Sequence, residues 1–165
     1  MFQSLIMLLL LTLAAPAVAQ ELETVRNRAF QVKYEVPAHW QLAHQRTDSV
    51  EVLRYHSPDG DALLWVGQLR GRHATLRPAR ALQRLLRHLG ATRHEEHNVS
   101  GHGLDFLEST GTCFVQGREL RYDARVTTYQ GHVLLVYLYA TPATFSTQAP
   151  VLHRMLDSLA PLRAE

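Results

Sequence analysis

Cysteine is nearly absent from this sequence of 165 residues. The single Cys113 cannot form an internal disulfide, so the fold does not depend on covalent cross-links. It stands in the β-prone apolar run 112–115, which predicts a small buried side chain and not a reactive thiol. A chain of this length buries enough surface to fold without such cross-links.

Motifs for catalysis and nucleotide binding are also missing. No glycine pattern resembles a phosphate-binding loop, and no Ser, Thr or Cys stands in a motif that pairs a nucleophile with a base. The paired carboxylates, Asp59 with Asp61 and Glu95 with Glu96, fall in segments typical of turns. We therefore expect no enzymatic activity and no cofactor. An enzyme without a recognisable motif stays as an alternative.

Lysine is almost lacking, and the net charge is small. Seventeen basic residues stand against fifteen acidic ones, so the total predicts no nucleic acid partner. The distribution is uneven, because no acidic residue occurs between Asp61 and Glu95. The arginines in that interval are Arg70, Arg72, Arg77, Arg80, Arg84, Arg87 and Arg93. This stretch is therefore the candidate for an anion-binding surface.

A long apolar run occurs at the N-terminus. Residues 5–13 are almost wholly apolar and are followed by Ala17-Val18-Ala19, the small-x-small pattern of a signal peptidase site. The run is shorter than the roughly 20 residues that a membrane-spanning helix needs. These features predict a cleaved signal peptide at 1–19 and a periplasmic or secreted single domain at 20–165. No Lys or Arg precedes the run, which leaves an uncleaved anchor as an alternative.

Alternating apolar and polar residues predict a mostly antiparallel sheet. Residues 30–36 form the first strand, and residues 50–56 and 62–69 form a hairpin around the turn Ser57-Pro58-Asp59-Gly60. Residues 132–140 are apolar on both faces, which is typical of a strand in the middle of a covered sheet. Further strands are predicted at 104–108, 112–116 and 118–129.

Two segments, residues 76–89 and 150–159, have the helical period of apolar residues. Gly90 follows the first of them in the position of a C-terminal cap. The predicted partner-binding residues lie on this helix, opposite its leucines, and are Arg77, Arg80, Arg84 and Arg87. The alternative is a solvated stripe, or one that pairs with acids of other elements such as Asp105 or Glu108. The fold class is α+β, with about six to seven strands and two main helices.

The segment Tyr34-Glu35-Val36-Pro37-Ala38-His39-Trp40 resembles the strand, Pro turn and Trp that begin domains of the PsbP-like fold. The hydrophobic strand 133–141, Phe145 and the closing Met155-Leu156-Asp157-Ser158-Leu159 are similar to the way those domains end. The resemblance covers roughly residues 28–162, with His39 where the family usually has Gly. It implies a curved antiparallel sheet between helices and a non-catalytic adaptor or binding role in exported bacterial proteins, with no catalytic residues to transfer.

A histidine-rich segment supplies weak metal-binding candidates, which are His94, His97 and His102. His94 and His97 would share a face only in a helix, whereas the Asn, Ser and Gly residues that follow predict a loop. We therefore expect no metal site. A small periplasmic metal-binding protein that uses this cluster stays as an alternative.

These observations favour a non-catalytic exported binding or adaptor domain. Its expected partner is an envelope protein or an anionic component such as a lipid or lipopolysaccharide, because the arginine stripe has no acid on its own helix. The residues identify no small-molecule ligand.

Overall fold

The computed structural model describes residues 20–163 as two α-helices, ten strands and one short 3-10 turn. The predicted signal segment 1–19 lies outside the described residues. The helices are α1 (Pro78–His88) and α2 (Pro142–Asp157). The strands are β1 (Leu22–Asn27), β2 (Val32–Pro37), β3 (Gln41–Arg46), β4 (Val50–His56), β5 (Ala62–Leu69), β6 (Arg93–Gly101), β7 (Leu104–Val115), β8 (Arg118–Tyr129), β9 (His132–Ala140) and β10 (Ala160–Pro161). In the described part of the chain, neither helix has the length and apolar character required to span a membrane.

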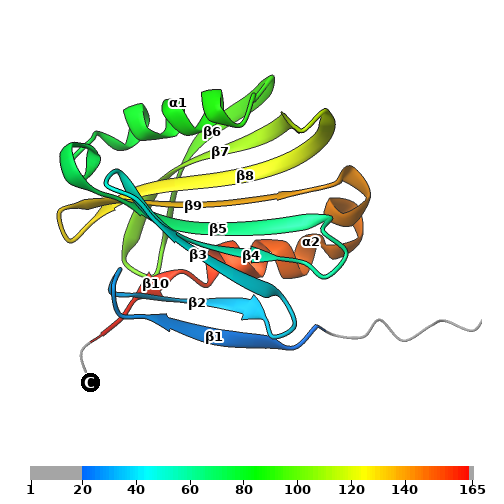
Figure 1. The fold of residues 1–165 in the computed structure, drawn as a ribbon, viewed down its shortest axis with the longest axis horizontal. Coiled ribbons are helices and arrows are strands. Elements are labelled where there is room, and N and C mark those ends of the chain that lie inside the picture. Colours follow the sequence, from blue (N-terminus) through cyan, green and yellow to red (C-terminus); the bar gives the residue numbers. More distant parts are fainter. Residues whose placement is uncertain (1–19, 164–165) are drawn as a thin grey trace, which may run out of the picture.

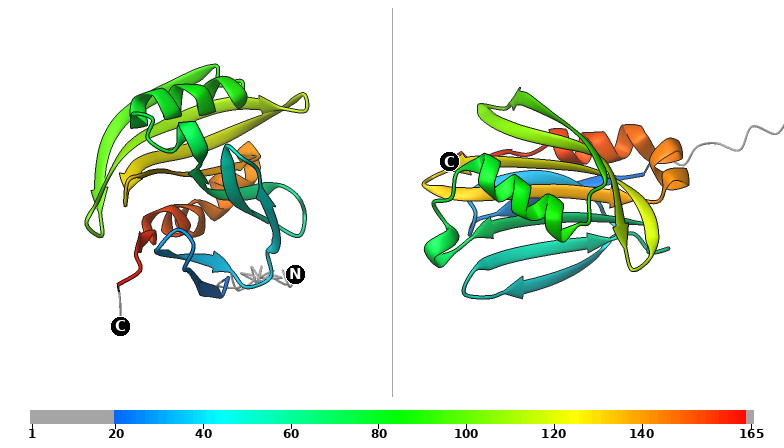
Figure 2. Two further views of the ribbon diagram at one scale, coloured as in Figure 1. Left: turned by 60° about the vertical axis from the view of Figure 1, so that its left-hand side comes forward. Right: turned by 90° about the horizontal axis from the view of Figure 1, so that it is seen from above.

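The strands form two antiparallel sheets. Seven strands pair in the order β3-β4-β5-β9-β8-β7-β6, and β1, β2 and β10 form a small second sheet. Helix α1 covers one face of the large sheet, and α2 lies between its other face and the small sheet (Figure 1). The large sheet curves around α2, with α1 on the outside (Figure 2). The expected α+β fold with a curved antiparallel sheet and two main helices is confirmed.

Strand β9 lies in the middle of the large sheet, between β5 and β8, as its two apolar faces predicted. Val133 and Leu135 face the leucines of α1 in one core. Leu134, Val136 and Leu138 face α2 and the small sheet in the other core. Because β9 contributes to both cores, it connects the two layers of the fold.

Helix α1 ends as its sequence predicted. Gly90 has a positive φ of 63°, a conformation that costs glycine little, and its N–H donates to the Arg87 carbonyl at 3.2 Å. The turns at Gln116-Gly117 and Gln130-Gly131 have positive φ at both residues of each pair. Such turns match the twist of the strands that they connect.

Two predicted boundaries are wrong. The segments 104–108 and 112–116 are one continuous strand, β7, because pairing with β8 continues through Ser109, Thr110 and Gly111. Helix α2 begins at Pro142 and not near Pro150, because the Thr141 side chain caps it by accepting the Thr144 N–H at 3.2 Å. Pro150 therefore lies inside α2, on an exposed position.

Strands β1, β3, β6 and β10 are absent from the sequence-based prediction. β3 shows why, since all six of its residues are exposed and its alternation of apolar residues is weak. It is an edge strand that forms by pairing with β4. The pairing comes from the backbone, so the side-chain pattern does not reveal it.

Candidate functional site

The predicted binding residues lie together on the exposed surface of α1. We call this set the α1 arginine face, and it consists of Arg77, Arg80, Arg84 and Arg87. All four are exposed, whereas the opposite side of the helix buries Ala81, Leu82 and Leu86. These buried residues pack with the β8 and β9 side chains of the large sheet. The packing fixes α1 against the outer face of the large sheet (Figure 2), and the exposed arginines lie on the side of the helix opposite its buried residues.

No acidic group neutralises the α1 arginine face within the described residues 20–163. The contact of Arg84 is with His73, at 3.1 Å between Nη1 and Nδ1, and none of the four arginines forms an ion pair there. The suggested acidic partners are engaged elsewhere. Asp105 accepts a hydrogen bond from Ser100 at 2.6 Å, and Glu108 binds Arg125 at 2.7 Å. The alternative in which Asp105 or Glu108 pairs with the stripe is therefore wrong.

The N-terminal end of α1 adds to this positive potential. Arg77 occupies the N-cap position without a side-chain capping bond, and the first turn contains no acid. The free N–H groups of a helix N-terminus carry partial positive charge. An anion at this end would interact with both the helix dipole and the guanidinium groups.

The histidine-rich segment is a strand, β6, and not the loop that its sequence predicted. Its residues pair with β7 in continuous register from Arg93 opposite Thr112 to Gly101 opposite Leu104. Side chains alternate between the faces of a strand, so His94 and His97 lie on opposite faces. Each histidine lies beside the glutamate on its own face of the strand. Nε2 of His94 is 3.8 Å from Oε1 of Glu96, and Nε2 of His97 is 3.5 Å from Oε2 of Glu95.

The third histidine is also separate. His102 stands in the turn after β6 with a positive φ of 52°, and it lines a cleft beside α2. Within the described part of the chain, no group of three His, Cys, Asp or Glu side chains is arranged to hold a metal ion. The structure thus does not bring His94, His97 and His102 together.

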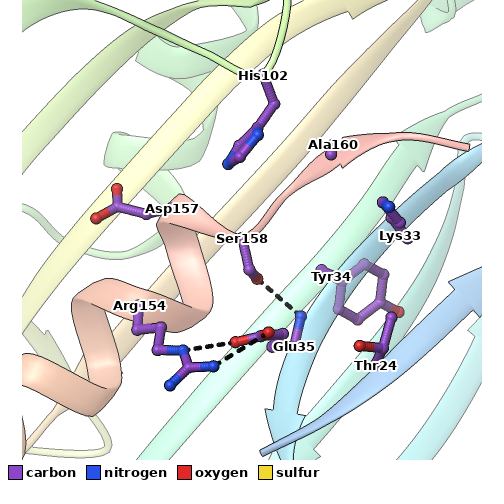
Figure 3. Close-up of a pocket in the computed structure, with 9 residues that line it drawn as sticks. All are labelled: Thr24, Lys33, Tyr34, Glu35, His102, Arg154, Asp157, Ser158 and Ala160. Carbon is purple, nitrogen blue, oxygen red and sulfur yellow. Dashed lines mark hydrogen bonds and ion pairs between the residues drawn. The ribbon is translucent and has the colours of Figure 1, made fainter.

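That cleft, of about 400 Å³, brings Ser158, His102 and Asp157 near one another (Figure 3). The three residue types resemble the members of a hydrolytic triad, but the hydrogen bonds do not. The Ser158 hydroxyl accepts the Glu35 N–H at 2.7 Å and donates to the Met155 carbonyl at 2.7 Å. It is bonded to backbone on both sides and fastens α2 to β2. An ion pair joins the same two elements, since Nε of Arg154 on α2 lies 2.7 Å from Oε2 of Glu35 on β2.

A buried polar cluster under α2 has no counterpart in the sequence-based prediction. Arg125 on β8 binds Glu108 of β7 at 2.7 Å and Asp157 of α2 at 2.8 Å. Asp123, two residues before Arg125 on the same strand face, is also buried. Burial raises the pKa of Asp123 to about 7, with a further upward contribution from the Glu108 carboxylate and an opposing one from Arg125. A carboxyl group that titrates near neutral pH is a common feature of functional sites.

Cys113 is fully buried, as its apolar surroundings predicted. Burial raises the pKa of its thiol to about 11. The thiol is therefore protonated at neutral pH, so it is a poor nucleophile.

Comparison with known proteins identifies the fold. No family model and no curated protein sequence matches the chain. The solution structure of cyanobacterial PsbP (CyanoP) from Synechocystis sp. PCC 6803 is similar, with a TM-score of 0.64 and 14% identity, over 92% of this chain and 98% of that one. PA94 from Pseudomonas aeruginosa, described as a putative regulator of unknown function, matches with a TM-score of 0.54 and 18% identity, over 88% and 99% of the two chains.

LpqN of Mycobacterium tuberculosis, described as involved in cell envelope biogenesis, matches with a TM-score of 0.52 and 15% identity, over 85% of this chain and 90% of that one. At these identities the likeness concerns the fold and not the activity. The PsbP-like fold implied by residues 34–40 and by the final strand and helix is thereby confirmed. This chain has the PsbP-like fold.

Proposed function

We propose that this protein is a non-catalytic binding domain of the cell envelope, and that its α1 arginine face recognises a phosphate-bearing lipid surface. The observation that carries the proposal is the set of four exposed guanidinium groups with no acidic partner in the described residues. Like charges at helical spacing destabilise a helix slightly, and an external anion would relieve that cost. Guanidinium groups also match the geometry of phosphate oxygens.

The composition of this surface favours lipid phosphate over an acidic protein. Protein interfaces have an apolar core, usually with aromatic residues. The exposed residues of α1 besides its arginines are Ala79, Gln83 and His88, and the exposed large apolar residues of the described chain, Leu42 and Phe114, lie on other elements. A surface of charge without an apolar core suits electrostatic attachment to anionic headgroups.

Reversing two charges of the face tests the proposal. We expect the double variant Arg80→Glu/Arg84→Glu to bind phosphatidylglycerol vesicles at least about tenfold more weakly, because each basic residue near an anionic surface contributes about 1 kcal/mol. Vesicle co-sedimentation at two salt concentrations measures this. The variant should also lose salt sensitivity, because exposed charges are screened over about 8–10 Å at physiological salt.

Stability should not fall in this variant. The two introduced carboxylates would stand three residues from Arg77 and Arg87, so that favourable pairs replace repulsive ones. The matched control Arg28→Glu/Arg163→Glu makes the same charge change at exposed positions near the small sheet and should bind vesicles normally. Equal binding by the α1 variant and the wild type would contradict the proposal. Equal loss in both double variants would show that only net charge matters, and would contradict it as well.

A role in the cell envelope also requires that the protein is exported. We expect protein recovered from a periplasmic fraction to begin at Gln20, because Ala17-Val18-Ala19 precedes it. Intact mass spectrometry or N-terminal sequencing measures this. A chain that retains Met1 and sediments with membranes would identify residues 1–19 as an anchor.

A further inference from the structure

One oxygen of the buried Asp123 carboxyl group lacks a hydrogen-bond partner, although the group lies within hydrogen-bonding reach of the Glu108 carboxylate. The residue is 5% exposed, and its Oδ1 has no hydrogen-bond partner among the described residues. The nearby Arg125 does not supply one, because its guanidinium donates to Glu108 and Asp157. A buried polar atom in this condition costs stability unless something else bonds to it.

Asp123 lines a pocket that could admit such a partner. The pocket has a volume of about 470 Å³ and lies between α2 and strands β6, β7 and β8. Thr110 and Thr112 of β7 contribute hydroxyl groups to its wall, and Phe145 and His153 contribute rings from α2. This volume is in the range of small-molecule sites, and the mixture of rings and a few polar groups is typical of them.

A guanidinium group at the same pocket complements the carboxyl group. Arg121 lies two residues before Asp123 on β8, so both side chains are on the strand face toward α2. Its guanidinium carbon lies 4.7 Å from the centre of the Phe145 ring, a cation–π contact that holds the charge at the pocket. The side chain is exposed and forms no ion pair within the described residues.

We propose that this pocket binds a small zwitterion, with its ammonium group on Asp123 and its carboxylate on Arg121. The two Cα atoms lie about 7 Å apart along the strand, since each residue of a strand advances about 3.4 Å. The side chains bridge part of that distance, so a ligand with its two charges separated by a few bonds would reach both. Free amino acids and the ends of short peptides have this chemistry. This site lies on the opposite face of the large sheet from the α1 arginine face, so it is independent of the lipid contact.

Ligand binding should then depend on whether the Asp123 carboxyl group is protonated. The titratable and charged groups around Asp123 and its pocket are Glu108 of β7, Arg121 and Arg125 of β8, His153 and Asp157 of α2, and His94 and Glu95 of β6. With a pKa raised to about 7, Asp123 is partly protonated at neutral pH, and an ammonium group would favour its charged form. Affinity for the zwitterion should therefore rise with pH between about 6 and 8.

A series of ω-amino acids tests the proposal with defined probes. Glycine, β-alanine, 4-aminobutyrate and 6-aminohexanoate would be titrated into the 15N-labelled protein, with n-butylamine and butyrate as single-charge controls. We expect at least one member to shift the β8 amide resonances and to bind about tenfold or more tightly than either control, because each control lacks one of the two charge-assisted bonds.

Two variants locate the site, and a third is the control. Asp123→Asn and Arg121→Gln should each weaken binding of that probe by about tenfold or more. Arg118 lies on the same strand, but its Nη2 is 2.9 Å from Oδ1 of Asp61, outside the pocket. The variant Arg118→Gln should therefore leave binding unchanged. Arg121 is exposed, so its replacement tests the site even if Asp123→Asn alters the fold. No binding by any probe at roughly 10 mM, a concentration that would saturate a site with a dissociation constant of about 1 mM, would overturn the proposal. Equal binding by Arg121→Gln and Arg118→Gln would overturn it too.

Discussion

The substitution Asp123→Asn is expected to stabilise the folded protein above pH 7 by about 2 kcal/mol or more. Burial raises the pKa of Asp123 from 3.8 to about 7, and one pKa unit corresponds to about 1.4 kcal/mol. Above pH 7 the wild type must keep an ionised carboxylate buried beside Glu108. Asparagine removes that charge and can donate a hydrogen bond to the Glu108 carboxylate.

The sign of the pH dependence follows from the raised pKa. The folded state holds the Asp123 proton more tightly than the unfolded chain does, so this group's contribution to stability is full below about pH 4. It is lost as pH rises through about 7. The variant should lack this loss, and its advantage over the wild type should grow between pH 4 and pH 8.

Denaturant unfolding at pH 5 and pH 8 measures this difference. Asp48→Asn is the matched control, because Asp48 is exposed and should show little effect at either pH. A variant that is less stable than the wild type at pH 8 would contradict the expectation. It would mean that an ionised Asp123 supports Arg125 in the buried cluster.

The second large effect is expected in the central strand. Leu138→Ala should lower the free energy of unfolding by about 2–5 kcal/mol, because loss of a buried leucine combines transfer and cavity costs. Leu138 is 0% exposed and packs in the core beneath α2. Leu135→Ala, on the other face of β9, should have an effect of the same order, since it is 5% exposed and packs toward α1.

The control for this prediction is Leu42→Ala. Leu42 lies on the edge strand β3 and is 55% exposed, so its truncation should cost less than about 0.5 kcal/mol. Denaturant titration of the three variants compares them directly. A small loss for Leu135→Ala and a large one for Leu138→Ala would show that α1 contributes little to stability and that the sheet is held mainly by α2.

The parts of the fold that could be predicted are those with a strong local period. Leucines recur along α1 at helical spacing, and the arginine face lies opposite to them as a geometric consequence. Strand β9 is apolar at consecutive positions, which places it centrally whatever the order of the other strands. The resemblance at residues 34–40 also indicated the PsbP-like fold. In each of these cases the deciding information lies within one continuous segment.

The buried cluster shows why other parts could not be predicted. On β8, Arg121, Asp123 and Arg125 alternate with Tyr122 and Ala124, a pattern that usually places the charged face in water. In the structure, α2 covers much of that face and buries Asp123 and Arg125. Nothing within the strand distinguishes a covered polar face from a solvated one.

The sequence alone therefore determined helix α1, the presence of a C-terminal helix but not its start, the central strand, the exposed arginines of α1 and the expectation of export. The tertiary structure decided three further matters: that β6 separates His94 from His97, that Ser158 bonds to backbone, and that Asp123 lines a pocket with Arg121. The physical reason is the distance along the chain over which each kind of information acts. The periodicity of side chains reports only on a single helix or strand. The surroundings of Asp123 come from β6, β7 and α2, which are far apart in sequence and lie together only when the sheet curves around the helix.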